Sequence, residues 1–125
     1  MSRKYPMKLR HLRPDEVIFT VNITNDLDTP VKSTVHANGE YLSVDTILER
    51  VRSGDRYAWF TATVTASWHN LIAPDWKWGL SFENGQAFLA SDTYGGMKTK
   101  ALERLQYVLE EKFKAVAPLI EKNAG

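Results

Sequence analysis

The residues able to do acid–base or metal chemistry are few in this chain and lie far apart. The three histidines are His11, His36 and His69. None has a second histidine or a carboxylate at a metal-ligand spacing on one predicted element. The chain has no cysteine, which excludes a thiolate zinc site, a cysteine nucleophile and a disulfide framework. The sequence therefore predicts no metal site and no cofactor.

Serine and carboxylate chemistry is no better supported. No Gly-x-Ser-x-Gly motif is present, and Ser81 falls inside a predicted strand, where a nucleophile elbow is not expected. Asp26 and Asp28 fall in a predicted turn, and Glu110 and Glu111 on a solvated helix face, whereas acid–base catalysis needs a cleft that moves two pKa values apart. A hydrolase or a ligand-sequestering protein would need a concave pocket that the sequence does not indicate. We therefore expect a protein without enzymatic activity.

The strongest functional signal is a concentration of aromatic residues. All four tryptophans, Trp59, Trp68, Trp76 and Trp78, fall within twenty residues that alternate at period two. This alternation predicts two paired strands with one core face and one open polar face. Tyrosine and tryptophan are enriched at protein interfaces and also stack on unpaired bases, so protein and single-stranded nucleic acid are both admissible partners. The predicted partner-binding residues on the open face are Tyr57, Trp59, Thr61, Lys77 and Ser81.

Tyr57 and Trp59 also have a structural interpretation. Segment 25–42 can cover both rings and form a second small core, since aromatic residues on strands are most often structural. Their exposure decides between the two interpretations.

The N-terminal residues 1–14 are strongly basic, although the net charge of the chain is only +1. This predicted arm has five cations and no acid: Arg3, Lys4, Lys8, Arg10 and Arg13. Such an arm can contact phosphate or an acidic protein, or it can be a solvated tail. We assign residues 15–125 to one domain, because a chain of this length buries one ordinary core.

Three elements precede the aromatic strands. Residues 16–24 alternate as a half-buried strand, and residues 31–37 form a short edge strand that ends at the Asn38-Gly39 turn. Residues 43–54 place their apolar side chains on one helical face, with Ser43 or Asp45 as the cap and Gly54 just after the end.

The aromatic strands are predicted at 56–68 and 76–83, joined by a loop at 69–75 that contains Pro74. In the first strand the even positions face the core and the odd positions form a threonine row. In the second, the core face is expected to carry Trp76, Trp78, Leu80 and Phe82.

The final helix has an apolar stripe at spacings of three and four. Its members are Leu102, Leu105, Leu109, Phe113, Val116 and Ile120. Pro118 is expected to end or kink the helix, and a short helical segment is expected at 86–91. The fold class is α+β: an antiparallel sheet of three to four strands in the order β-α-β-β-α, with the C-terminal helix on one sheet face.

No apolar run reaches the length of a membrane span, and the basic start is not followed by the apolar segment of a signal peptide. We therefore expect a cytoplasmic protein without a membrane partner.

Residues 16–112 resemble a family of small uncharacterised proteins encoded by bacteriophages, prophages and plasmids. The resemblance rests on segment 57–68, on Gly79-x-Ser81-Phe82-Glu83 and on Tyr94-x-x-Met97-Lys98-x-x-Ala101-Leu102. The family has Gly-Gly-Cys-Ser-Tyr where this chain has Trp78-Gly-Leu-Ser-Phe82. No established activity accompanies the family, so the resemblance supplies no catalytic residues.

The resemblance implies an accessory protein of a mobile element. Such genes often encode inhibitors of host defence, so we expect a non-enzymatic binding protein whose partner is a host protein or complex, and an anti-CRISPR inhibitor is one example. The alternative is a single-stranded nucleic-acid-binding protein that uses the basic arm and the aromatic sheet face. The sequence also permits a homodimer.

Overall fold

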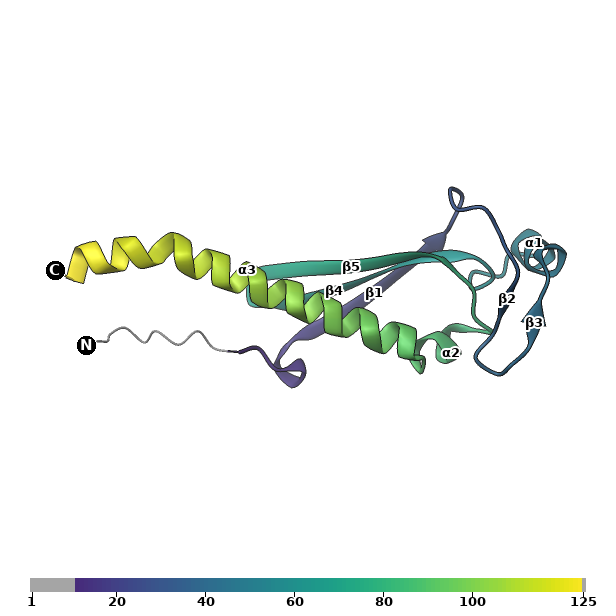
Figure 1. The fold of residues 1–125 in the computed structure, drawn as a ribbon, viewed down its shortest axis with the longest axis horizontal. Helices are drawn as coiled ribbons and strands as arrows, with labels where there is room; N and C mark the ends of the chain where they lie inside the picture. Colours follow the sequence, from purple (N-terminus) through teal and green to yellow (C-terminus); the bar gives the residue numbers. More distant parts are fainter. Residues whose placement is uncertain (1–10, 125) are drawn as a thin grey trace.

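The computed structural model describes residues 11–124, and the side chains of residues 11–115. The fold is α+β, as predicted, with a three-stranded antiparallel sheet and a long C-terminal helix packed against one of its faces (Figure 1). The strands of this sheet follow the order β1-β4-β5. The elements are η1 (Pro14–Glu16), β1 (Ile18–Asn25), β2 (Thr34–Val35), β3 (Tyr41–Leu42), α1 (Val44–Arg52), β4 (Phe60–Trp68), β5 (Leu71–Leu80), α2 (Gly85–Leu89) and α3 (Asp92–Ala124).

The central strand β4 has the two faces that its alternation predicts. Phe60, Ala62, Val64 and Ala66 are fully buried, whereas the threonines between them are only half-buried. The three small or β-branched side chains after Phe60 let α3 approach the sheet closely, and Leu105 of α3 is likewise fully buried. This face of the sheet is therefore the main core.

Strand β5 begins earlier than predicted, and this reverses the faces of two tryptophans. The expected loop at 69–75 is wrong, because only His69 and Asn70 separate β4 from β5, and Trp68 pairs with Leu71. Pro74 lies inside β5, where an edge strand tolerates a residue without an N–H donor. The expected burial of Trp76 and Trp78 is wrong as well. Their exposed fractions are 46% and 57%, and they lie on the face away from α3.

A bulge at Gly79 restores the predicted faces for the rest of the strand. The register shifts by one residue between the pairs Phe60–Leu80 and Ala62–Lys77. Gly79 has a φ of 69°, a left-handed conformation that suits glycine at a bulge. Leu80 therefore packs against the core, and Phe82 is buried, as the sequence analysis expected.

Helix α3 lies along β4 and β5 for the length of the sheet and continues beyond it (Figure 1). It begins at Asp92, so Gly95 and Gly96 lie within it, and Asn84 caps the short helix α2, which lies in the predicted helical segment. Pro118 does not end the helix, since the helical backbone runs to Ala124, and the alternative expectation of a kink there stays a prediction. In the described part of the chain, no helix is both long and apolar enough to cross a membrane.

A second, smaller core lies at the end of the molecule that carries α1 and the β2–β3 hairpin (Figure 1). It consists of Leu42, Ile47 and Trp59, with Val31 and Val51 packed around them. The predicted edge strand forms β2, which pairs with β3 in a separate two-stranded sheet. Helix α1 begins after the Ser43 cap, and Gly54 has the positive φ expected after its end.

Candidate functional site

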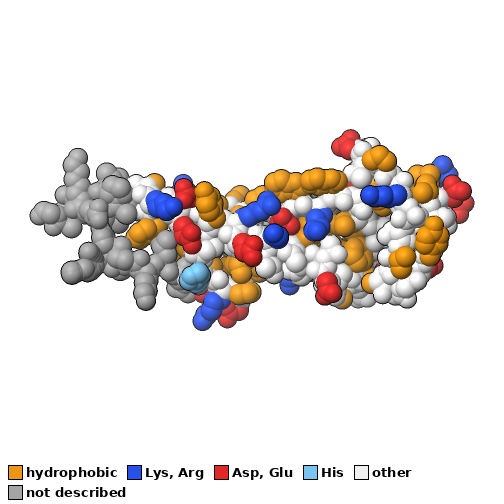
Figure 2. Space-filling model, in the orientation of Figure 1, with side chains coloured by type: hydrophobic (Ala, Val, Ile, Leu, Met, Phe, Trp, Pro, Cys, Tyr) orange, Lys and Arg blue, Asp and Glu red, His pale blue; other side chains and the backbone are white. Residues whose placement is uncertain are grey.

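The face of the sheet opposite α3 is not covered by any described element, and we call it the bare face. Its centre is a row of half-buried hydroxyl side chains from β4, and its flanks are exposed side chains from β1 and β5. Hydrophobic side chains gather along the upper rim of the molecule, over β5 (Figure 2). The residues of the bare face are Ile18, Thr20, Asn22, Thr24, Thr61, Thr63, Thr65, Ser67, Ile72, Pro74, Trp76 and Trp78.

Of the five predicted partner-binding residues, Thr61 lies on the bare face, and the two aromatic residues do not. Trp59 is only 3% exposed, and its indole N–H donates to the Thr29 carbonyl at 3.0 Å. Tyr57 precedes β4 and packs edge-on against Phe60, with ring centroids 5.5 Å apart. The structural interpretation is therefore confirmed for Trp59, which segment 25–42 covers, whereas Tyr57 joins the main core.

Lys77 and Ser81 are also absent from the bare face. Lys77 pairs with Ala62, whose side chain faces α3, so Lys77 lies on the α3 side of β5, where its side chain is exposed. Ser81 follows the bulge, and its Oγ lies 3.0 Å from Nε2 of His36. The expected open-face position is wrong for Lys77, because the short β4–β5 turn reverses the parity of β5 before the bulge. Ser81 has the predicted parity, but it follows the end of β5 and contacts the β2–β3 hairpin, so it does not belong to the bare face.

Most of the predicted basic arm lies outside the described residues, namely Arg3, Lys4, Lys8 and Arg10. Arg13 is described and forms ion pairs with Asp15 at 3.3 Å and Glu16 at 3.7 Å. Leu12 is buried in the main core, and its N–H donates to Gln106 Oε1 at 2.9 Å. Packing against the domain therefore begins within the predicted arm.

A polar cluster that the sequence analysis did not identify joins the β2–β3 hairpin to the end of β5. His36 is 4% exposed, and its Nε2 faces both Ser81 Oγ at 3.0 Å and Arg50 Nη1 at 3.3 Å. Its Nδ1 lies 3.8 Å from a Glu40 oxygen and 3.9 Å from a Glu83 oxygen, beyond hydrogen-bonding distance. Of the described residues, none hydrogen-bonds to His36 Nδ1 or to Glu83 Oε1.

This cluster has the residue types of a serine–histidine–carboxylate site, but neither carboxylate lies within hydrogen-bonding distance of His36 Nδ1. Burial lowers the pKa of His36 below 6.5; the Arg50 charge adds to this effect, whereas Glu83 and Glu40 oppose it. Arg50 also donates to the Phe82 carbonyl at 2.8 Å and pairs with Asp55 at 2.7 Å. The contacts of Arg50 and His36 thus connect α1, the hairpin and the segment after β5.

A concave site lies at one end of the bare face, and we call it the tryptophan hollow. It has a volume of about 590 Å³ and is lined by Asp26, Asp28, Thr29, Pro30, Thr61, Trp76 and Trp78. The two tryptophans were not predicted here, because a loop that contains Pro74 puts them on the core face. Edge strands tolerate proline, so a two-residue turn at His69-Asn70 was the alternative.

Within residues 11–124, no group of three or more histidine, aspartate or glutamate side chains is placed to hold a metal ion. The chain is an α+β protein whose sheet has one face packed and the other bare. Comparison with known protein families, with characterised proteins and with solved structures gives no match to this chain.

Proposed function

We propose that the chain is a non-enzymatic protein-binding protein that uses the bare face of its sheet. The observation that carries this proposal is the exposure of large apolar side chains on an uncovered sheet face. Ile18 is 66% exposed, Ile72 64%, Trp76 46% and Trp78 57%. Several large apolar side chains exposed on one uncovered face mark an interaction surface in soluble proteins.

The composition of the bare face supports a protein partner. The exposed tryptophans flank a row of threonines on β4, so the surface combines apolar area with short hydroxyl side chains. Interfaces between proteins have this mixture of aromatic anchors and uncharged polar groups, with few charges at the centre. Of the twelve bare-face residues, none is charged.

The resemblance to proteins of bacteriophages, prophages and plasmids suggests the kind of partner. Under this proposal, the chain is an accessory protein of a mobile element, and it binds a host protein or complex in the bacterial cytoplasm. Inhibition of a defence complex, as by an anti-CRISPR protein, would follow from occupying that complex's surface.

Single-stranded nucleic acid is the weaker alternative on this surface. Tyr57 and Trp59, the two rings expected to stack on bases, face inward. The exposed rings of Trp76 and Trp78 share their hollow with Asp26 and Asp28, whose charges repel phosphate.

Site-specific photo-crosslinking in a bacterial lysate tests the proposal. A benzoylphenylalanine residue replaces Thr63 at the centre of the bare face in one sample and Glu111, exposed on α3, in the other. We expect a discrete cross-linked protein only from the Thr63 position, and excess unlabelled wild-type chain should compete with it. Equal cross-linking from both positions, or none from Thr63, would contradict the proposal that the bare face is the binding surface.

A charge substitution provides the matched control. Thr63→Lys places a cation on the centre of the bare face and should abolish competition, whereas Glu111→Lys should compete like wild type. Both positions are solvent-accessible, so circular dichroism should show an unchanged fold.

A further inference from the structure

The tryptophan hollow has the shape and chemistry of a site for a positively charged side chain. We propose that it binds an arginine or lysine side chain presented by the protein partner. This inference rests on the proposed protein-binding function and adds the chemistry of the contact. The hollow lies between the exposed rings of Trp76 and Trp78 and the 26–30 loop.

The hollow carries two negative charges. Asp26 accepts three backbone N–H groups: Oδ1 from Asp28 at 3.0 Å and from Thr29 at 2.9 Å, and Oδ2 from Gly79 at 2.7 Å. Desolvation raises the pKa of Asp26, but the hydrogen bonds from Thr29, Asp28 and Gly79 outweigh it and lower the pKa to about 2. Asp26 is therefore ionised at neutral pH, and its hydrogen bonds hold the loop against the bulge of β5.

Neither charge is neutralised within the described part of the chain. The carboxylate of Asp28 is exposed, and no described lysine or arginine forms an ion pair with Asp26 or Asp28. A cation that enters the hollow would meet uncompensated negative charge beside a low-dielectric aromatic wall, where charge–charge attraction is stronger than in bulk water.

The tryptophan rings add a second attraction for cations. The negative face of an indole ring attracts ammonium and guanidinium groups, and tryptophan is the strongest aromatic partner. Trp76 already shows this contact within the molecule, because the Arg104 guanidinium lies 5.3 Å from its ring centroid. Trp78 has no such contact with a described residue and is the more exposed of the two rings. A planar guanidinium suits the site better than an ammonium, since it can stack on the ring and pair with Asp28 at once.

Apolar residues beside the hollow favour a protein as the source of the cation. Leu27 lies at the tip of the loop and is 87% exposed, and Ile72 is exposed further along β5. A basic side chain with an apolar neighbour would contact the hollow and Leu27 together, whereas a free metal ion or a polyamine would leave Leu27 in water.

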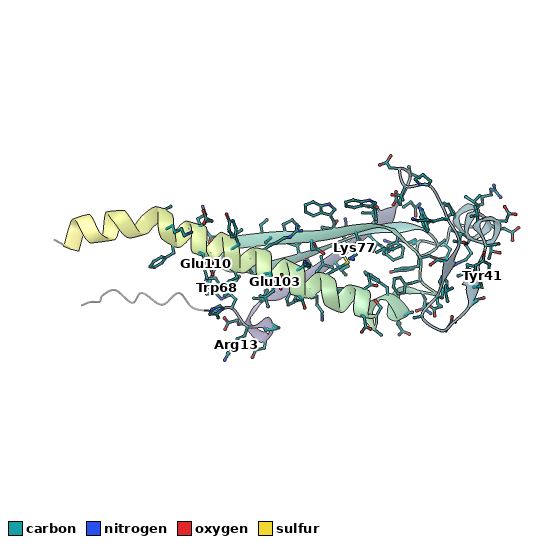
Figure 3. All side chains as sticks on the ribbon, viewed as in Figure 1. Arg13, Tyr41, Trp68, Lys77, Glu103 and Glu110 are labelled. Atoms are coloured by element: carbon teal, nitrogen blue, oxygen red, sulfur yellow. The ribbon has the colours of Figure 1, made fainter. Side chains whose placement is uncertain are left out.

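Indole N–H signals of ¹⁵N-labelled protein provide the test, with N-acetyl-arginine amide as the probe. We expect a saturable shift of the Trp78 and Trp76 signals, and none at Trp68, which lies at the other end of β4 (Figure 3). N-acetyl-citrulline amide has nearly the same shape without the charge and should bind at least about fivefold more weakly. Equal shifts with both compounds, or no shift with either, would overturn the inference.

Two variants and a control locate the contact. Asp28→Asn and Trp78→Ala should each weaken arginine binding several-fold, whereas Asp45→Asn, which neutralises an exposed aspartate on α1, should not. Loss of binding in all three would show a non-specific charge effect and would contradict the site. If Trp78→Ala loses its fold, Asp28→Asn still decides the result.

The remaining outcomes separate this inference from the proposed function. A (dT)10 oligonucleotide that shifts the Trp78 signal in competition with the arginine amide would assign the hollow to nucleic acid and overturn the inference. Cross-linking from Thr63 without any arginine effect would leave the protein-binding surface standing and reject the cation site.

Discussion

At the scale of single residues, His36 couples the stability of the domain to pH. Burial lowers its pKa below 6.5, so near pH 6 the imidazole is less protonated in the folded chain than in the unfolded chain, which has the ordinary value. Below pH 6.5, His36 binds a proton more readily in the unfolded chain than in the folded chain. The contribution of His36 to the free energy of unfolding is therefore present above pH 6.5 and is lost as the pH falls towards the folded pKa.

His36→Gln should remove this part of the pH dependence. Urea denaturation between about pH 5 and 7.5 should give a wild-type slope steeper than that of the variant by up to about 1.4 kcal/mol per pH unit. His69→Asn, which replaces an exposed histidine in the β4–β5 turn, is the control. Identical slopes for wild type and His36→Gln would mean that the histidine is protonated as easily in the folded chain as in the unfolded chain.

For single residues, the sequence predicts only part of the site. Alternation alone predicts the open-face position of Thr61, because β4 is regular from Phe60 onward. Tyr57 and Trp59 precede that regular pairing, and their burial depends on segments distant in sequence, Trp59 being held by Thr29. The polar cluster around His36 joins residues 45 positions apart, and no local pattern predicts such a contact.

At the scale of elements, the bulge of β5 lies between the small core and the loop of the tryptophan hollow. Gly79 has a φ of 69°, and its N–H donates to Asp26. A Cβ on this residue would lie 3.2 Å from Cγ2 of Thr29 and 3.3 Å from Cζ2 of Trp59. The backbone strain and the crowding therefore act at the same position.

Gly79→Ala compared with Gly54→Ala separates these two effects. Gly54 also has a positive φ, 89°, but a Cβ there meets nothing within 4 Å. We expect Gly54→Ala to lower the free energy of unfolding by about 1 kcal/mol through strain alone, and Gly79→Ala by about 1–2 kcal/mol more. Urea denaturation of both variants measures the difference. Equal losses would show that the loop and Trp59 move aside without cost.

The elements themselves were largely predictable, whereas the register of β5 was not. Helix α1, the hairpin turn at Asn38-Gly39 and the strand β4 follow from local periodicity and turn chemistry. The face of Trp76 depends on whether the preceding turn has two residues or seven, and Pro74 permits both readings. One residue of register exchanges the faces of a strand, so a small error in the turn reversed the assignment of two tryptophans.

At the scale of the whole molecule, the two cores are packed around different elements. The main core lies between the sheet and α3, and the small core lies between α1, β3 and the start of β4. Trp59 belongs to the small core, and Phe60, the next residue, to the main one. The small core has only three buried members, so we expect it to open locally without unfolding the sheet.

Hydrogen exchange of two core variants tests this division. Ile47 and Leu105 are both fully buried, one in each core, and replacing either with alanine should cost about 2–5 kcal/mol in the unit to which it belongs. Ile47→Ala should speed exchange in α1 and the β2–β3 hairpin and leave the β4 amides protected. Leu105→Ala should speed exchange throughout the chain, because the sheet loses its packing against α3. If Ile47→Ala speeds hydrogen exchange in β4 and α3 to the same extent as in α1, the two cores unfold as one unit. In that case the hairpin cannot move independently of the bare face.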